Sequence, residues 1–432
     1  MISTSQNRVI TGNITDNVMA LYGAQIGRKL IPLISIPYLA RTLGPAGWGT
    51  VAFFTALAEF LVILIEFGFN LSATREIARH REQPEECGRV MAGVLGSQVV
   101  LAASGVALVL VLAPWVPLLA HNHLLLLSGL LYGVAQGFSP VWFFQGLERM
   151  GLSSALELTG KTLSLVCVLL FVHTPADGWK VLALGGLAPA MMTLAGLALA
   201  YRQIPLHRPT VALVRTALKM GWPMFVFRSA ESLYGVGNVF LLGLFAPPVL
   251  VGYFASAEKI AKAVSGLLNP IREAIYPRLS SLAKSGGRSA AAPLARAGAA
   301  ITICGGLLLS ALLLMEAPVI ARLLLGGTFG PAVEVLRIFS ALPVLLSITY
   351  SIGFQWLLPF GRDAVINQII FAAGVVNVVL SILLARPYAH VGMAWAVVLS
   401  EAVVCALMVV AVWRMFGDWK AAEPNVVMGA SL

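Results

Sequence analysis

About twelve apolar stretches, each long enough to cross a lipid bilayer as a helix, follow one another along this 432-residue chain. They fall near residues 17–40, 48–69, 90–112, 123–146, 153–172, 180–201, 216–246, 249–280, 295–316, 332–359, 364–385 and 392–416. Only 11% of the residues are charged, too few to cover a water-soluble surface of this size. Since lipid leaves no partner for free backbone groups, the spans should be helices. The pattern therefore predicts an all-α polytopic membrane protein.

The distribution of basic residues predicts the orientation of the spans. If the N-terminus is cytoplasmic, 17 of the 29 Lys and Arg residues lie in cytoplasmic connections and 4 in outer ones. Positive charge favours the cytoplasmic side of a membrane, so we expect both termini there. Arg28 and Lys29 interrupt the first apolar stretch, which favours a retained helix over a cleaved secretory signal.

A weak internal repeat divides the chain into two halves. An offset of 203 residues places residues 248–252 over residues 45–49. Each half would hold six spans in the same orientation, and the halves would be related by an axis along the membrane normal. We expect two six-helix lobes around a central cavity. Their predicted ranges are residues 1–201 for the N-terminal lobe, 202–215 for a cytoplasmic linker, 216–416 for the C-terminal lobe and 417–432 for a cytoplasmic tail.

The predicted spans contain eight basic residues. They are Arg28, Lys29, Lys161, Arg228, Lys259, Lys262, Arg272 and Arg337. Each would cost about 2.5–3.5 kcal/mol near the bilayer centre if it faced lipid, so we expect them to face protein, water or substrate. Several share polar stripes on their helices, which predicts one hydrated cationic cavity that binds the substrate.

Some of these charges have acidic neighbours on the same helix. The pairs are Glu157 with Lys161, Arg228 with Glu231, Glu258 with Lys262, and Glu334 with Arg337. Their spacing fits a structural ion pair as well as contact with substrate. Arg28 and Lys29 are the first candidates for substrate contact, because the first span contains no acidic residue. Glu59 and Glu66 are candidates for coupling transport to protons or sodium.

Other functions are poorly supported by the residues. A nucleic-acid surface would need basic clusters with interleaved aromatic residues, and the chain has no such run. Cys87, Cys167, Cys304 and Cys405 are widely separated and lack neighbouring histidines, so we expect neither a metal site nor a disulfide framework. No glycine-rich loop for a nucleotide and no cofactor motif is present.

Four segments carry a resemblance to a known family. They are Pro37-Tyr-Leu-Ala-Arg41-Thr-Leu-Gly44-Pro45; Glu66-Phe-Gly68-Phe-Asn70 through Arg75; Trp142-Phe-Phe-Gln145-Gly146-Leu-Glu148-Arg149; and Gly326 through Arg362. In these segments the chain resembles the Wzx-type oligosaccharide-lipid flippases of the polysaccharide transporter family. The superfamily also holds MATE exporters and lipid II flippases.

The resemblance implies a non-enzymatic transporter of MATE-like fold in the bacterial inner membrane. Such proteins move undecaprenyl-diphosphate-linked oligosaccharide repeat units from the cytoplasmic to the periplasmic leaflet, for O-antigen or other polysaccharide synthesis. Membrane lipids, a polysaccharide polymerase and a chain-length regulator are the implied partners. The cationic cavity of the family corresponds in position to the intramembrane basic residues listed above.

Three alternatives remain at this stage. A cation-coupled multidrug exporter of MATE type would favour an acidic cavity, whereas the first span offers only basic charge. A lipid II flippase belongs to the same mechanistic class. A membrane glycosyltransferase or ligase would need acidic or metal-binding motifs on a large outer loop, and the sequence offers none there.

Overall fold

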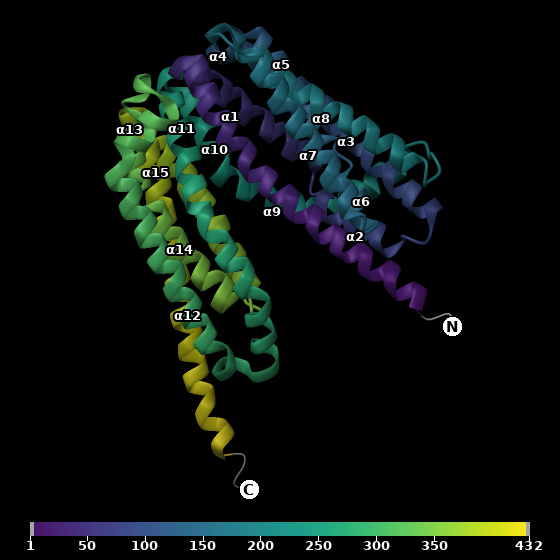
Figure 1. Ribbon diagram of the computed structural model, residues 1–432, viewed down its shortest axis with the longest axis vertical. Helices are drawn as coiled ribbons and strands as arrows, with labels where there is room; N and C mark the ends of the chain where they lie inside the picture. Colours follow the sequence, from purple (N-terminus) through teal and green to yellow (C-terminus); the bar gives the residue numbers. More distant parts are fainter. Residues whose placement is uncertain (1–3, 429–432) are drawn as a thin grey trace. The chain divides into compact units, whose positions relative to one another are not determined.

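A computed structural model describes the backbone of residues 4–428 and the side chains of residues 31, 34–229, 232, 235–285, 287 and 289–415. The described backbone contains helices and short connections, with no strand (Figure 1). The α-helices are α1 (Thr4–Glu66), α2 (Phe69–Arg79), α3 (Pro84–Leu112), α4 (Pro117–Ala120), α5 (His123–Gly137), α6 (Val141–Gly146), α7 (Met150–Phe171), α8 (Gly178–Tyr201), α9 (Val211–Gly235), α10 (Gly237–Phe245), α11 (Pro248–Ser265), α12 (Asn269–Leu325), α13 (Ala332–Phe339), α14 (Leu342–Ile352) and α15 (Asp363–Met428). Short 3₁₀ helices are η1 (Ala113–Trp115), η2 (Pro175–Asp177), η3 (Gly266–Leu268) and η4 (Gly327–Phe329), and η5 (Gly353–Leu357) is a π-helix.

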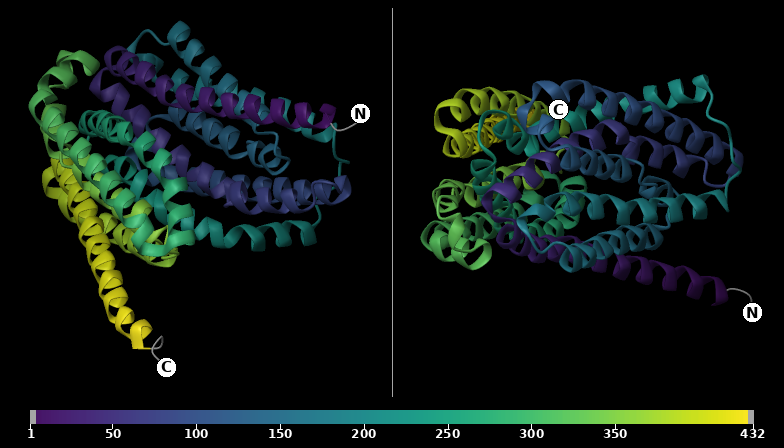
Figure 2. Two further views of the ribbon diagram at one scale, coloured as in Figure 1. Left: turned by 60° about the horizontal axis from the view of Figure 1, so that its bottom comes forward. Right: turned by 90° about the horizontal axis from the view of Figure 1, so that it is seen from above.

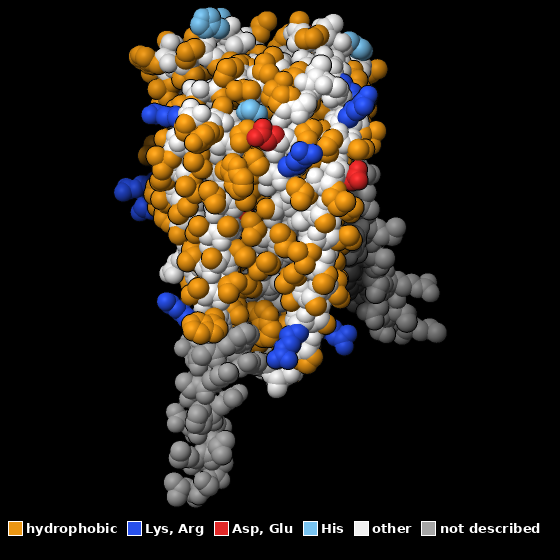
Figure 3. Space-filling model, turned by 90° about the vertical axis from the view of Figure 1, so that its left-hand side faces the viewer, with side chains coloured by type: hydrophobic (Ala, Val, Ile, Leu, Met, Phe, Trp, Pro, Cys, Tyr) orange, Lys and Arg blue, Asp and Glu red, His pale blue; other side chains and the backbone are white. Residues whose placement is uncertain are grey.

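Eight helical stretches among the described residues are long and apolar enough to cross a membrane. They are Ile34–Arg79, Pro84–Trp115, His123–Gly146, Met150–Phe171, Pro175–Tyr201, Ser289–Leu325, Ala332–Leu357 and Asp363–Met415. One face of the molecule, seen in Figure 3, carries mostly hydrophobic side chains with basic groups scattered among them. A lipid environment solvates such a surface, so the predicted all-α polytopic membrane fold is confirmed.

Three of the long helices each consist of two helices joined at a bend. The bends lie at Gly44 (φ 67°) in α1, Gly287 (φ 61°) in α12 and Ala389 (φ 47°) in α15. Glycine adopts a positive φ without steric penalty, which accounts for the first two positions. Each bend separates two of the predicted spans. With these bends, every predicted span lies on one helix or on two or three successive helices.

The chain divides into two compact units. Unit 1 comprises residues 1–232 and 247–252, and unit 2 comprises residues 233–246 and 253–432. Helix α9 therefore belongs mostly to unit 1, while α11 begins in unit 1 and continues in unit 2. The lobe boundaries predicted from the sequence stay a prediction.

In unit 1, α5 packs along α8, and both contact α1, as Figure 1 shows. A hydrophobic core lies where α2, α3 and α6 meet. Trp142, Phe143 and Phe144 of α6 are buried in this core, with successive rings edge to face at 6.1 and 5.4 Å. The Thr74 hydroxyl of α2 donates a hydrogen bond to the carbonyl oxygen of Trp142 at 3.1 Å. The three aromatic residues of the Trp142 to Arg149 segment therefore pack in the core of unit 1 and stabilise it.

The connection after α8 is packed against α3 of the same unit. A Cβ atom on Gly88 would come within 2.6 Å of the carbonyl oxygen of Pro205, and one on Gly93 within 2.9 Å of that of Leu213. The Ser97 hydroxyl donates to the carbonyl oxygen of Val214 at 3.3 Å. Small residues on α3 therefore let the connection after α8 and the first turn of α9 pack closely against it.

In unit 2, α12, α14 and α15 pack together, and the green-to-yellow helices in both views of Figure 2 correspond to this group. Its core contains Leu279 and Ala295 of α12, Trp356 of η5, and Ala373 and Met408 of α15. Alanine and glycine on these helices let the backbones approach closely, as is usual in membrane bundles.

Candidate functional site

Two of the eight candidate basic residues cannot be placed. Arg28 and Lys29 fall on α1, but their side chains lie outside the described residues. The remaining six lie on described parts of the two units, and each unit is considered separately.

In unit 1, the second half of α1 contributes two carboxylates to a polar cluster. The Tyr132 hydroxyl of α5 donates to Glu59 Oε1 at 3.3 Å. Arg228 Nη2 of α9 lies 3.7 Å from Glu66 Oε2. That separation is too long for a good hydrogen bond, so the two groups interact as an open ion pair. The Arg228 side chain is 45% exposed, which leaves several of its N–H groups accessible to another anion.

The expected partner of Arg228 on its own helix was Glu231, whose side chain lies outside the described residues. The contact with Glu66 joins α9 to α1, which are distant in the sequence. Spacing along one helix could not have indicated this pair.

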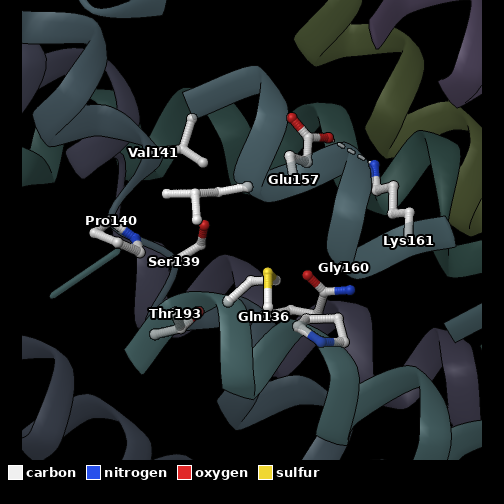
Figure 4. A pocket seen from close by; sticks show the side chains of 11 residues that line it. Gln136, Ser139, Pro140, Val141, Glu157, Gly160, Lys161 and Thr193 are labelled. Carbon is white, nitrogen blue, oxygen red and sulfur yellow. Dashed lines mark hydrogen bonds and ion pairs between the residues drawn. The ribbon is translucent and has the colours of Figure 1, made fainter. Parts of the chain in front are cut away.

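Lys161 lies at the edge of a small pocket within unit 1. Its Nζ is 2.7 Å from Glu157 Oε1, and Figure 4 shows this ion pair beside the pocket. The lining residues are Gln136, Ser139, Pro140, Val141, Leu156, Glu157, Gly160, Lys161, Pro189, Met192 and Thr193. With a volume of about 30 Å³, the pocket has room for about one water molecule. The same-helix pair expected from the sequence forms here, and the pocket is too small for a sugar.

A second cavity of unit 1, of about 280 Å³, lies among its connections. Arg81 and Arg149 line it. Arg81 Nη1 is 2.8 Å from Glu148 Oε1, and Arg149 Nη1 donates to Gln203 Oε1 at 2.8 Å. Arg81 is therefore paired with a carboxylate, whereas the partner of Arg149 is a neutral amide, which does not balance its charge.

In unit 2, Lys262 has two partners. Its Nζ lies 3.0 Å from Glu258 Oε1 and donates to the carbonyl oxygen of Gly235 at 2.9 Å. Glu258 is buried, so the expected pair on α11 forms and neutralises a carboxylate in the core. Lys259 also has an interaction partner within the described structure. Both lysines therefore have partners within the protein and can stabilise the fold.

Arg272 is held differently from the other basic residues. Its guanidinium carbon lies 4.8 Å from the ring centre of Tyr350 and 4.4 Å from that of Phe354. No carboxylate within the described part of the chain forms an ion pair with it. Stacking on two rings fixes the plane of the guanidinium and leaves its N–H edges for hydrogen bonds. The arrangement can bind a phosphate oxygen in a fixed orientation.

Arg337 of α13 is exposed. The pair expected with Glu334 is not found among the described ion pairs. Its backbone carbonyl accepts a hydrogen bond from the Ser340 hydroxyl at 2.6 Å. The spacing of Glu334 and Arg337 would permit a pair, but the two side chains do not meet.

Glu401 is a candidate functional residue that was not predicted from the sequence. This residue of α15 is only 4% exposed, and no ion-pair partner is found for it in the described part of the chain. Nearby on α15, the Asn377 amide donates to the Ser400 hydroxyl at 3.3 Å. A lone acid in the predicted span 392–416 was the signal that could have identified it. A buried carboxyl group inside a membrane span is a candidate for proton or cation binding.

No group of three or more His, Cys, Asp or Glu side chains that could hold a metal is found among the described residues. In each unit, the candidate residues are charged and aromatic side chains that can bind an anion and hydrogen-bond a polar ligand.

Comparison with known proteins identifies the relatives of this chain. The family model described as "Polysaccharide biosynthesis protein" matches residues 14–283. A protein of Escherichia coli (strain K12), named "Putative O-antigen transporter", is 30% identical over 398 residues, which cover 91% of this chain and 95% of the relative.

Two solved structures show a similar fold. "Lipid II flippase MurJ, inward closed conformation" matches with a TM-score of 0.71 and 11% identity, over 92% of this chain and 87% of that one. An outward-facing MATE family multidrug transporter matches with a TM-score of 0.55 and 15% identity, over 94% of this chain and 96% of that one. At these identities the likeness concerns the fold alone.

Proposed function

The chain belongs to the polysaccharide biosynthesis protein family, and from this premise we propose that it is a flippase for undecaprenyl-diphosphate-linked oligosaccharide repeat units. The units would move from the cytoplasmic to the periplasmic leaflet of a bacterial inner membrane, for synthesis of O-antigen or a related surface polysaccharide. The observation that carries the proposal is the similarity to the relative named "Putative O-antigen transporter", which extends over 91% of this chain. Moving an intact lipid-linked glycan requires no covalent step, so no enzymatic activity is proposed.

The proposed orientation places both termini in the cytoplasm. It rests on the excess of Lys and Arg in alternate connections. A polysaccharide polymerase and a chain-length regulator are the proposed partners, because they would use the glycan delivered to the outer leaflet.

The basic residues of the spans are proposed to bind the diphosphate of the substrate. Arg272 is the strongest candidate among the described residues, because its guanidinium has no competing carboxylate. Arg228 follows, because its ion pair with Glu66 is loose and partly exposed. Charge-assisted hydrogen bonds from such groups can replace the hydration that the diphosphate loses. Arg28, Lys29, Lys161, Lys259, Lys262 and Arg337 complete the proposed set.

The membrane potential can drive this transport. With the cytoplasm negative, moving about two negative charges outward is favoured by roughly 4 to 5 kcal/mol per 100 mV. Counter-transport of protons or sodium is a further proposed contribution, with Glu59 and Glu66 as candidate groups. Glu401 joins them because its carboxyl group is buried.

The test is deletion of the chromosomal copy followed by complementation at native expression. We expect loss of surface polysaccharide and accumulation of lipid-linked glycan on the cytoplasmic leaflet, which can be measured by accessibility to a membrane-impermeant glycosidase in inverted and right-side-out vesicles. Accumulation on the periplasmic leaflet would instead indicate a later step and would contradict the proposal. A change in drug susceptibility with normal polysaccharide would favour a multidrug exporter.

A further inference from the structure

Three aromatic side chains form a cluster where α1, α2 and α9 meet. The rings of Phe67 and Phe225 are stacked, with centres 4.4 Å apart and planes at 15°. The Trp222 ring lies 6.1 Å from Phe67 and 5.9 Å from Phe225. Phe67 is buried, whereas 56% of Trp222 is exposed. The aromatic cluster is therefore buried at Phe67 and exposed at Trp222.

The backbone holds this cluster in place. Phe67 has a φ of +43°, a strained value for a residue with a side chain, and Gly68 follows with a φ of +75°. A Cβ on Gly68 would come within 2.5 Å of Met224 Cβ, and one on Gly221 within 2.5 Å of the carbonyl oxygen of Phe67. Because the two backbones touch, the rings are fixed in position without a ligand. A preformed surface loses little conformational freedom when it binds.

Polar groups border Phe67 and Phe225 of the cluster. Glu66 directly precedes Phe67, and Arg228 lies one helical turn after Phe225. These two residues form the loose ion pair, and the Asn70 side chain lies close enough to Glu66 to interact with its carboxylate. A carboxylate, a guanidinium and an amide therefore lie next to residues of the aromatic cluster, in which Trp222 is the exposed ring.

We propose that the aromatic cluster binds a sugar ring of the glycan carried by the substrate, an inference that rests on the proposed flippase function. A pyranose ring has an apolar face of C–H groups, which carry a small positive charge and stack on the negative face of an aromatic ring. Its hydroxyl groups can bond to Glu66, Asn70 and Arg228, whose planar side chains accept and donate in pairs. The cluster and its polar border present both kinds of contact together.

An interfacial tryptophan that only contacts lipid is the ordinary alternative. Trp413 and Trp115 have that character, since they are 77% and 72% exposed and contact no other ring among the described pairs. Trp222 differs because it lies against two rings, and one of these rings belongs to Phe67, which directly follows Glu66 of the ion pair.

The experiment compares two probes on the full-length protein purified in detergent. One probe is farnesyl diphosphate, and the other is the same lipid diphosphate bearing a single N-acetylglucosamine. For Trp222→Ala we expect about fivefold weaker binding of the glycosylated probe, the size usual for one aromatic contact. Binding of farnesyl diphosphate should not change. Trp222→Phe should retain most of the affinity, and Trp413→Ala should match the wild type for both probes.

Two results would overturn the inference while leaving the flippase intact. The first is equal binding of both probes by the wild type, and the second is an equal loss for both probes in Trp222→Ala. Failure of the wild type to bind farnesyl diphosphate at all would count against the proposed function itself, and against this inference with it. Thermal unfolding of each variant checks that the fold is retained.

Discussion

Gly49 and Gly252 pack reciprocally in unit 1. A Cβ atom on Gly49 would overlap the carbonyl oxygen of Pro248, and one on Gly252 would overlap that of Pro45. The 203-residue offset of the internal repeat aligns these same two segments. A two-fold relation between two copies of one motif produces a contact of this mutual kind. The weak sequence repeat thus corresponds to a physical contact in which each copy uses its glycine in the same way.

Replacing either glycine by alanine should destabilise the protein. The overlapping atoms belong to the backbone and cannot rotate away, and overpacking of this kind costs about 1–3 kcal/mol. We expect Gly49→Ala and Gly252→Ala each to lower the thermal unfolding midpoint of the purified protein. Gly330→Ala is the matched control, because no atom lies within 4 Å of a Cβ there. A midpoint of Gly49→Ala equal to that of the wild type would refute the close approach.

The helical spans could be predicted because lipid imposes both length and composition on them. The bend positions could not all be predicted. Gly44 and Gly287 are residues that tolerate a positive φ, but Ala389 adopts one without any local signal in its side chain. Its conformation reflects the packing of the surrounding helices.

Contacts within one helix were also predictable. Lys161 meets Glu157 and Lys262 meets Glu258, as a four-residue spacing permits, although the pair predicted for Glu334 and Arg337 is not found among the described ion pairs. Contacts between helices could not be predicted from the sequence, because they depend on tertiary packing. The rings of Tyr350 and Phe354 that stack on Arg272 come from other helices.

The stacked guanidinium of Arg272 leads to a second prediction. Lysine keeps the positive charge but lacks the planar fork that stacks on rings and bonds two oxygens at once. We expect Arg272→Lys to transport lipid-linked glycan at least fivefold more slowly, nearly as slowly as Arg272→Ala. The measurement is glycan flipping in proteoliposomes under an imposed membrane potential. Arg322→Lys, at an exposed position outside the proposed binding set and without such stacking among the described contacts, should be close to wild type. Equal rates for the arginine and lysine forms at residue 272 would show that charge alone suffices.

A third prediction concerns Glu59. Glutamine at this position can still accept the hydrogen bond from Tyr132, but it cannot release or bind a proton. If Glu59 couples an ion, Glu59→Gln should lose the response of transport to an imposed proton or sodium gradient. The response to membrane potential should remain. Glu82→Gln serves as an exposed control. A normal gradient response in both Glu59→Gln and Glu66→Gln would exclude these groups as the coupling site.

The last prediction concerns backbone strain at Glu148, two residues after the end of α6. Glu148 has a φ of +59°, a left-handed conformation that costs a residue with a side chain about 1–2 kcal/mol. Its carboxylate pairs with Arg81 at 2.8 Å, but 70% of the Glu148 side chain is exposed. An exposed ion pair contributes about 0–1 kcal/mol. If glycine replaces Glu148, the relief of backbone strain should therefore stabilise the protein by more than the loss of the ion pair destabilises it. This holds even when the greater flexibility of glycine in the unfolded chain is included.

We expect Glu148→Gly to raise the free energy of unfolding by up to about 1 kcal/mol. Glu148→Ala keeps the strain and removes the pair, so it should be slightly less stable than the wild type. The unfolding midpoints of the wild type, Glu148→Gly and Glu148→Ala, measured on the purified proteins in the same detergent, give their order of stability. If Glu148→Gly were the least stable of the three, the ion pair with Arg81 would contribute more than the strain costs, and the carboxylate would be the reason that glutamate occupies this strained position.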